Sequence, residues 1–282
     1  MYLNKSREVE SNLLPLYLKN KRLGKVHSKF KSGINIQFED VLVYISYVGA
    51  PLSAFGINVE KEKLLKIINS VSIDDTVVFK DNKLIFYSIY ENTIVSLKNI
   101  TKLNLKLPRI KCDKKQITTN ALYNFLEEYE FENLIGIDLD DKTYEYVDLL
   151  LNSDKTNPDI NKKIIKFFIG RGKGLTPSGD DILIGFTMAL MTFDNNGDLN
   201  NWIKDINIMM NENLTTIISV SYLKALTKGY LSEHFIELIK SMDCKENKII
   251  YETVKKVQTF GHTSGNDTLF GFFLGLKFLV KN

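Results

Sequence analysis

The stretch Ile34-Asn35-Ile36-Gln37-Phe38-Glu39-Asp40-Val41-Leu42-Val43-Tyr44-Ile45 decides the fold of the first part of the chain. β-branched and aromatic residues dominate on both sides of the acidic pair Glu39-Asp40, and such runs are typical of strands. Two runs of similar length joined by a short polar turn indicate a hairpin. The stretch therefore predicts two antiparallel strands.

Similar runs lie on both sides of this hairpin. Residues 76–79 and 83–87 are rich in Val, Ile, Phe and Tyr, and the turn Asp81-Asn82 separates them. Strand patterns broken by Gly, Asn and Asp extend from Gly24 to about Leu107, with one helical pattern at 61–69. The first part of the chain is predicted to be β-rich.

After Pro108 the apolar residues recur three and four positions apart, which is the period of an amphipathic helix. The predicted helices are 118–129, 159–168, 181–193, 202–226, 232–240, 245–260 and 267–280. Strands followed by helices, without alternation, argue against a doubly wound nucleotide-binding fold. We expect an α+β protein with a β-rich domain at 1–108 and a helical domain at 109–282.

Composition restricts the class of protein. The 282 residues carry 37 Lys and Arg against 34 Asp and Glu, a formal net charge of +3, so no global field recruits nucleic acid or a membrane surface. Cys112 and Cys244 lack the spacing of zinc or redox motifs. The N-terminal residues mix charges among apolar side chains, unlike a signal peptide, and the apolar stretches 182–193 and 269–280 are shorter than a membrane-spanning helix. We expect a cytoplasmic protein.

A glycine-rich loop opens the apolar helix predicted at 181–193. It reads Gly170-Arg171-Gly172-Lys173-Gly174-Leu175-Thr176-Pro177-Ser178-Gly179-Asp180-Asp181. Alternate glycines free the backbone to turn N–H groups toward one centre, and Arg and Lys add donors for a phosphate or carboxylate. The loop resembles neither a P-loop nor a dinucleotide fingerprint. It predicts an anion site at a helix N-terminus.

A second copy of the turn stands near the C-terminus, at Gly261-His262-Thr263-Ser264-Gly265-Asn266-Asp267. Aligned on the serines, the copies share a Ser-Gly-polar-Asp turn followed by Leu and Gly-Phe at a constant offset of 264 − 178 = 86. Glycine within a helix is unfavourable by about 1 kcal/mol relative to Ala unless something packs closely against it. Gly185 and Gly271 therefore predict two helices in close contact.

This repeat predicts one shared site. Ser178, Asp181, Ser264 and Asp267 would face a common cleft with Arg171 or Lys173 on its rim, and a bound anion or a capping side chain would satisfy the first N–H groups of both helices. The alternative is a pair of structural turns in which Ser178, Asp180 and Asp181 only cap a helix. The expected substrate-binding or phosphate-binding residues are Gly170, Arg171, Gly172, Lys173, Gly174, Thr176, Ser178, Gly179, Asp180, Thr263, Ser264, Gly265 and Asn266.

Together these residues resemble a bacterial family. The two turns, with Thr215-Thr216 and Ser219 between them and Gly24-Lys25-Val26-His27-Ser28 near the start, are similar to the AllH-type family with its LTPSGDD motif. Its members include a subunit of the three-component oxamate carbamoyltransferase of allantoin catabolism, a route of purine degradation. The resemblance extends over nearly the whole chain; Asn266 in place of a second Asp is one departure.

The resemblance implies a carbamoyltransferase subunit. The reaction would join carbamoyl phosphate and oxamate into oxalurate and phosphate, or run in reverse, and the partners would be two larger subunits. The alternative is a non-catalytic subunit that binds an anion or metabolite and serves assembly.

Acid–base and metal chemistry have few candidates. Histidine titrates near neutrality, so His262 and His27 are candidate catalysts beside Asp181 and Asp267, whereas His234 is expected to be structural. Asp180, Asp181 and Asp267 could bind Mg²⁺ beside a phosphate, with helix capping as the equal alternative; no other cofactor is expected. Residues 138–141, Asp-Leu-Asp-Asp, lack the rest of a calcium loop and are expected to form a solvated turn.

Overall fold

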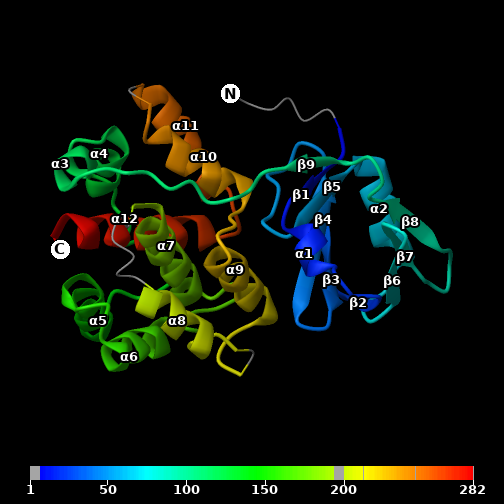
Figure 1. Cartoon of the computed structure of the whole chain (residues 1–282), viewed down its shortest axis with the longest axis horizontal. Helices are drawn as coiled ribbons and strands as arrows, with labels where there is room; N and C mark the ends of the chain where they lie inside the picture. The colour runs from blue at the N-terminus through cyan, green and yellow to red at the C-terminus, as the bar shows by residue number, and fades with distance from the viewer. Residues whose placement is uncertain (1–6, 194–199, 212, 245, 282) are drawn as a thin grey trace. The chain divides into compact units, whose positions relative to one another are not determined.

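A computed structural model describes residues 7–193, 200–211, 213–244 and 246–281 (Figure 1). The chain forms two compact units. The first comprises residues 1–106 and 230–233, and the second comprises 107–229 and 234–282. An N-terminal sheet over residues 9–103 is followed by helices over 114–281, which confirms the α+β class.

The first unit is a nine-stranded sheet with the order β8-β7-β6-β2-β3-β4-β5-β1-β9. Its strands are β1 (Val9–Ser11), β2 (Leu23–Phe30), β3 (Gly33–Phe38), β4 (Val41–Tyr47), β5 (Gly56–Val59), β6 (Thr76–Lys80), β7 (Lys83–Phe86), β8 (Thr93–Ser96) and β9 (Thr101–Leu103). Neighbouring strands are antiparallel except for the pairs β4–β5 and β1–β9. The short helices α1 (Leu14–Tyr17) and α2 (Lys61–Ser70) belong to the same unit, and α2 confirms the helix predicted at 61–69.

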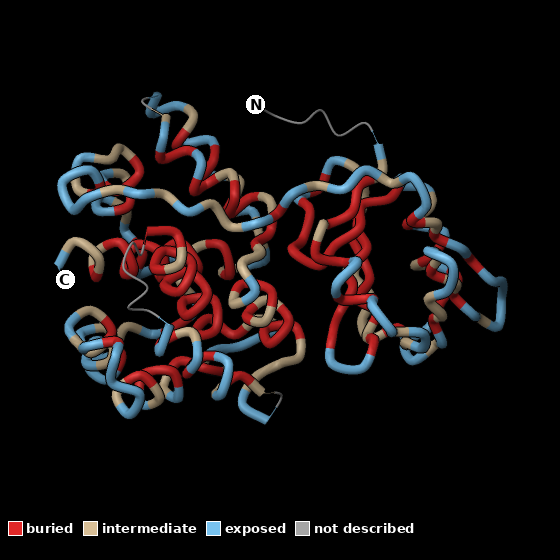
Figure 2. Tube along the Cα trace, in the orientation of Figure 1, coloured by how far each residue is buried: buried red, intermediate tan, exposed pale blue. Residues whose placement is uncertain are grey.

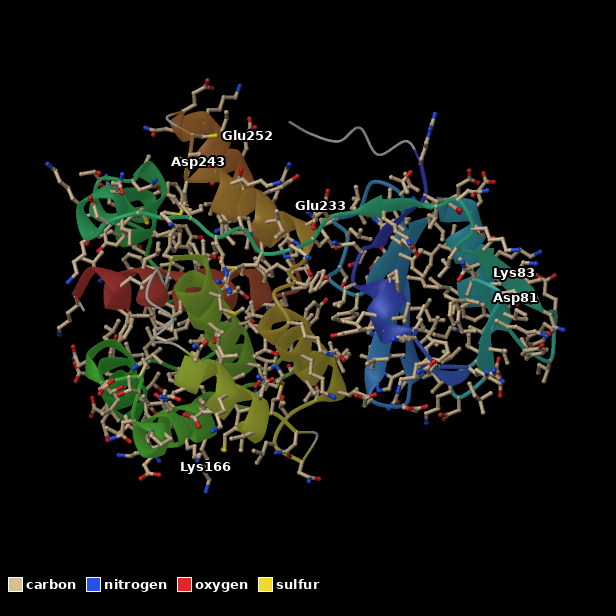
Figure 3. All side chains as sticks on the ribbon, viewed as in Figure 1. Asp81, Lys83, Lys166, Glu233, Asp243 and Glu252 are labelled. Atoms are coloured by element: carbon tan, nitrogen blue, oxygen red, sulfur yellow. The ribbon has the colours of Figure 1, made fainter. Side chains whose placement is uncertain are left out.

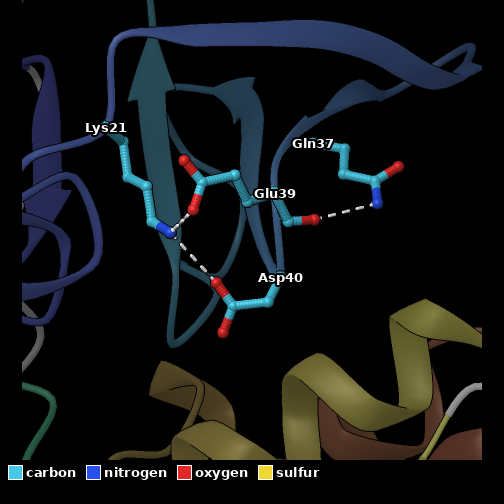
Figure 4. Close-up of polar contacts among 4 residues, drawn as sticks. All are labelled: Lys21, Gln37, Glu39 and Asp40. Atoms are coloured by element: carbon cyan, nitrogen blue, oxygen red, sulfur yellow. Dashed lines mark hydrogen bonds and ion pairs between the residues drawn. The ribbon is translucent and has the colours of Figure 1, made fainter.

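Both predicted hairpins are present. Val41 faces Phe38 across the turn at Glu39-Asp40, where Glu39 has a φ of 50°. Figure 4 shows Lys21 in ion pairs with both acidic residues of this turn, 3.1 Å from Asp40 Oδ1, while Gln37 Nε2 donates to the Glu39 carbonyl oxygen at 3.0 Å. Polar turn residues tolerate such left-handed angles better than bulky ones do.

The second hairpin joins β6 and β7. Lys80 faces Lys83 across Asp81 and Asn82, whose φ angles are 52° and 57°. Two consecutive left-handed residues are the mark of the type I′ turn that suits the twist of a two-residue hairpin. Asp81 and Lys83 are labelled in Figure 3 on the strand pair that carries this turn.

The chain returns to the sheet unit through residues 230–233. The Leu231 N–H donates to the Leu105 carbonyl oxygen at 3.0 Å, and the Ala54 N–H donates to Ser232 Oγ at 3.2 Å. Glu233, labelled in Figure 3, accepts a 2.8 Å bond from the Leu52 N–H through its side chain. These bonds pair polar backbone groups that would otherwise be left without partners.

The second unit is helical. Its helices are α3 (Lys114–Thr118), α4 (Ala121–Glu127), α5 (Asp141–Asn152), α6 (Pro158–Phe168), α7 (Ser178–Phe193), α8 (Asn200–Met209), α9 (Ile217–Thr227), α10 (Glu233–Ser241), α11 (Asn247–Gln258) and α12 (Ser264–Lys281). Red segments in Figure 2 trace α7 along almost its whole length, in keeping with its burial on every side. A helix that is apolar all round belongs in the interior of a domain.

Three sequence predictions about the helices are wrong in detail. The single helix predicted at 202–226 is two helices, because Thr216 caps α9 by accepting from the Ser219 N–H. The helix predicted at 118–129 is likewise divided, with Asn120 capping α4. No helix was expected at α5, which Asp140 caps by accepting from the Thr143 N–H at 2.7 Å. In each case a short polar side chain satisfies first-turn amides, so the helix begins there. Lys245, the predicted start of α11, lies outside the described residues.

A buried lysine lies in the core of this unit. Lys155 is 3% exposed, and its ammonium group is 4.8 to 5.8 Å from the ring centres of Phe186, Trp202 and Phe278. The Ser153 hydroxyl accepts a 2.7 Å hydrogen bond from it. Burial lowers the pKa of Lys155 to about 7, because removal from water disfavours the charged form.

Candidate functional site

The glycine-rich loop folds back over the start of α7. Gly170, Gly172 and Gly174 have φ angles of 71°, 118° and 96°, so the loop uses the conformational freedom that the sequence predicted for its alternate glycines. A Cβ at Gly170 would stand 2.0 Å from the Leu214 carbonyl oxygen, and one at Gly172 would stand 2.7 Å from the Ser178 nitrogen. Glycine is therefore required at both positions for space as well as for φ.

The first amides of both helices bond to backbone carbonyls. In α7 the Gly179 N–H donates to the Arg171 carbonyl at 2.8 Å, and the Asp181 N–H donates to that of Pro177 at 3.3 Å. In α12 the Gly265 N–H donates to the Phe260 carbonyl at 3.0 Å, and the Asp267 N–H to that of Thr263 at 2.9 Å. The expectation that an anion or a capping side chain must satisfy these groups is wrong for Gly179 and Gly265, because the preceding loop curls back to supply the acceptors. The Asp181 and Asp267 amides make the first ordinary i to i−4 bonds of their helices.

Helices α7 and α12 touch through their glycines, as predicted. A Cβ at Gly185 would meet the Thr268 carbonyl oxygen at 2.0 Å, and one at Gly271 would meet the Ile182 carbonyl oxygen at 2.1 Å. Such distances leave no room for a side chain, so backbone lies against backbone. Figure 1 shows the two helices crossing in the middle of the helical unit.

The close approach brings the two turns together. Asp181 of α7 interacts with the Ser264 hydroxyl that begins α12, and Asp267 of α12 interacts with the Ser178 hydroxyl that begins α7. A 2.7 Å hydrogen bond joins Thr176 Oγ1 and Ser264 Oγ across the same junction. The four turn residues are 0 to 6% exposed. They therefore gather at a buried point.

The two aspartates hold their protons unusually firmly. Burial raises the pKa of Asp181 well above its usual range, and the charges of Asp267 and Asp180 raise it further, whereas hydroxyls of Ser264 and Thr176 oppose the shift. Burial also raises the pKa of Asp267, against hydrogen bonds from the Gly136 N–H, Thr263 and Ser178. In the described part of the chain, Asp181 Oδ2 and Asp267 Oδ2 are buried without a hydrogen-bond partner. Buried polar atoms of this kind are rare and mark a place where a proton or a ligand donor belongs.

Asp180 has a different position from Asp181. One of its oxygens accepts a 2.7 Å bond from the Gly170 N–H, and the other accepts from the Thr215 hydroxyl. The carboxylate thus holds the glycine-rich loop against the segment that leads into α9. Its counterpart Asn266 holds Gln258 instead, at 3.2 Å from the Gln258 side-chain nitrogen.

The basic residues and histidines lie around this point or away from it. The Arg171 guanidinium lies 4.2 Å over the Phe167 ring and 3.9 Å from an Asp140 oxygen, whereas Lys173 and His262 are exposed on the two loops. His234 is buried 4.5 Å from the Phe260 ring. His27 belongs to the sheet unit, on β2.

Gly136 is a contributor that the sequence analysis missed. Its N–H donates to Asp267 Oδ1 at 2.8 Å, and a Cβ there would stand 2.4 Å from Ser178 Oγ and 2.7 Å from Thr263 Oγ1. The only signal in the sequence is a lone glycine between two isoleucines. Gly136 is exposed, so the amide that holds Asp267 belongs to a segment at the surface.

The metal hypothesis gains no direct support. Among the described residues, no group of three or more His, Cys, Asp or Glu side chains is arranged to hold a metal ion. Two carboxylates with facing hydroxyls are still oxygen donors of the type that Mg²⁺ prefers. The magnesium site at Asp180, Asp181 and Asp267 stays a prediction.

The comparisons with known proteins bear on this same region. Residues 168–276 match the family model described as oxamate carbamoyltransferase subunit AllH. This part of the chain is therefore similar to the AllH-type family. The match begins at the end of α6, ends within α12 and includes both turns and the helices between them. No solved structure matches the chain.

Within the described ranges, none of the helices combines the length and apolar character needed to cross a bilayer.

Proposed function

We propose that this chain works as the AllH-type subunit of an oxamate carbamoyltransferase and that its anionic substrate binds at the paired turns of the helical unit. The observation that carries the proposal is the exchange of side chains between the turns, Asp181 with Ser264 and Asp267 with Ser178. The family match spans this same arrangement. A packing device alone would not require two buried carboxyl oxygens without partners.

The residues suggest a division of roles. Lys173 and the exposed part of loop 170–176 supply positive charge and N–H groups for a phosphate or carboxylate. A protonated Asp181 or Asp267 can donate a hydrogen bond to a carbonyl oxygen or return a proton to a leaving group, because its raised pKa keeps the acid form available. His262 on the second loop is the exposed base of the set. Substrates of this class are oxamate, oxalurate and carbamoyl phosphate.

The test is phosphorolysis of oxalurate. The chain would be purified with its partner subunits, and carbamoyl phosphate formed from oxalurate and phosphate would be measured for the wild type and for Asp267→Asn. We expect a loss of about 100-fold or more in turnover for the variant, the range of acid–base catalysis. Asp138→Asn is the matched control, because Asp138 is exposed in the same unit. Absence of turnover by every combination of subunits would refute the proposal.

A second candidate is a non-catalytic assembly or metabolite-binding subunit. The bonds from the first-turn amides to backbone carbonyls favour it, because those amides are then already engaged without a ligand. The same variants separate the two roles. Loss of turnover in an intact complex favours catalysis, whereas loss of complex formation by Asp181→Asn and Asp267→Asn favours assembly.

A further inference from the structure

Strand β2 contains a bulge in the sheet unit. Val26 pairs with Ile36 of β3 and Ser28 pairs with Asn35, so His27 is one residue more than the partner strand can match. The strand lies between β3 and β6, in the interior of the sheet (Figure 1). A bulge places two residues opposite one and redirects their side chains.

The redirected side chains form a polar cluster. In a regular strand His27 and Ser28 would point to opposite faces. Here His27 Nδ1 and Ser28 Oγ are 3.2 Å apart, and Asn35 Nδ2 donates to Ser28 Oγ at 3.0 Å. Asn35 is 4% exposed, whereas His27 and Ser28 are half-buried and within reach of solvent.

The donors and acceptors have one consistent arrangement. The Asn35 amide nitrogen only donates, so it occupies an acceptor position on Ser28 Oγ. The Ser28 hydroxyl proton is then free to point to His27 Nδ1, provided that the ring carries its own proton on Nε2. A hydroxyl within hydrogen-bond reach of an imidazole is the arrangement of a nucleophile and its general base. Here the Asn35 amide orients the hydroxyl rather than the base.

We propose that Ser28 is a nucleophile with His27 as its general base, in a second site on the sheet unit that takes activated esters. In the first step a bond forms from Ser28 Oγ to the carbonyl carbon, and the bond from that carbon to its leaving oxygen breaks. The hydroxyl proton passes to His27 Nδ1 and then to the leaving oxygen. Water then attacks the acyl carbon, its proton passes through His27 to Ser28 Oγ, and the bond from Ser28 to the acyl group breaks. The acid is released, and water is the only other reagent that the reaction consumes. The proposal stands apart from the paired turns of α7 and α12.

The test uses p-nitrophenyl acetate on the full chain. Release of p-nitrophenolate is followed by stopped flow, and the acetylated position is found by peptic digestion at low pH and mass spectrometry. We expect one acetyl group on Ser28 and loss of that label in Ser28→Ala. In His27→Gln the rate should fall at least tenfold, because the base contributes about 100-fold or more. Ser96→Ala is the matched control, since Ser96 is another half-buried strand serine of the same sheet and lacks a histidine contact in the described bonds.

Asn35→Asp tests the orientation of the hydroxyl. A carboxylate at this position accepts the Ser28 proton and turns it away from His27, so acetylation should slow in the folded variant. Because Asn35 is buried, the carboxylate also lowers the melting temperature, so the rates are compared at a temperature where both proteins are folded. A merely structural role for Asn35 would leave the acetylation rate of the folded variant unchanged. The proposal is overturned if wild-type Ser28 is acetylated no faster than Ser96, whatever the variants do, or if folded His27→Gln reacts at the wild-type rate.

Discussion

Replacing Gly185 by alanine tests whether α7 and α12 must touch at their backbones. The new Cβ would stand 2.0 Å from the Thr268 carbonyl oxygen and 2.6 Å from the Phe272 nitrogen, where ordinary contact begins at 3.4 Å. The helices would have to separate by roughly 1.4 Å at this point, and forced separation of a packed core typically destabilises by about 1–3 kcal/mol. Alanine returns up to about 1 kcal/mol through its better helix propensity. We therefore expect a net loss of about 0–2 kcal/mol in the free energy of unfolding.

The assay is urea unfolding followed by tryptophan fluorescence. Trp202 is the single tryptophan of the chain, is fully buried, and donates from its indole nitrogen to Thr187 of α7 at 3.0 Å. Its emission therefore reports on the helical unit alone, which avoids mixing the unfolding of two units. Gly271→Ala should match Gly185→Ala, since its Cβ meets a backbone oxygen at 2.1 Å.

Gly275→Ala is the matched control on α12. Its nearest neighbour is the Ala189 methyl group at 2.5 Å, with the Phe186 carbonyl oxygen next at 2.9 Å, so the required shift is smaller. We expect a smaller loss of stability than for Gly185→Ala. The reasoning fails if Gly185→Ala and Gly271→Ala unfold at a higher urea concentration than the wild type, because propensity would then outweigh contact.

Four further outcomes are expected. First, folding raises the pKa of Asp181 and Asp267, so above the ordinary carboxyl pKa the folded chain binds more protons than the unfolded chain. The free energy of unfolding should therefore fall as pH rises through the raised pKa values. Asp267→Asn should make this pH dependence weaker in urea titrations at several pH values. Second, the pKa of Lys155 is lowered to about 7, so stability should rise as pH increases from about 7 toward the ordinary lysine value near 10.4, and Lys155→Met should raise the unfolding midpoint at pH 6. Third, Asn82→Gly should stabilise the sheet unit by about 0.5–1 kcal/mol, because residue 82 has a φ of 57°, which glycine adopts without strain. A melting temperature that does not rise in calorimetry would contradict the type I′ turn. Fourth, Asp180→Ala should destabilise the helical unit by about 1–3 kcal/mol in the Trp202 assay, since the Gly170 N–H and the Thr215 hydroxyl lose their acceptor.

The fold class and the hairpins were predictable because they depend on local chemistry. Strand runs around Glu39-Asp40 and Asp81-Asn82 carry their own turn signals, and the offset of 86 residues between the two Ser-Gly turns is visible in the sequence. The glycines at 185 and 271 predicted a helix contact for a physical reason, the absence of a side chain. Each of these features needs only neighbouring residues or an exact repeat.

The rest depends on contacts between distant segments. Nothing local indicates that Gly136 donates to Asp267, 131 residues away, or that Lys155 lies among three aromatic rings. The spacing of apolar residues also cannot locate the break before α9, because the helical pattern runs on through it. The break is made by one residue, Thr216, whose side chain caps the new helix. Asp181 and Asp267 illustrate this point as well. The sequence predicted that the two carboxyl groups lie close together, but their burial depends on how the loops fold over them.

The repeated helix pair is symmetric where it packs and asymmetric where it meets solvent. Gly179 and Gly265 each lie against a carbonyl of the preceding helix, Phe168 and Val257, at Cβ distances of 1.9 and 2.0 Å. The loops before the turns share no such equivalence. The first carries three left-handed glycines and is fastened by Asp180 to the start of α9, whereas the second carries one, Gly261, and ends in the exposed His262 and half-buried Thr263.

Packing constraints act equally on both copies, so they account for the shared glycines and for the exchange of serine and aspartate contacts. They do not account for a cationic, glycine-rich loop on one side and a histidine on the other. A substrate with two unlike ends, one anionic and one to be protonated or deprotonated, needs a site with two different loops: a cationic loop for the anionic end and a loop with an acid or base for the other. For that reason the differences between the two copies, rather than the repeat itself, are the better guide to the chemistry of the helical unit.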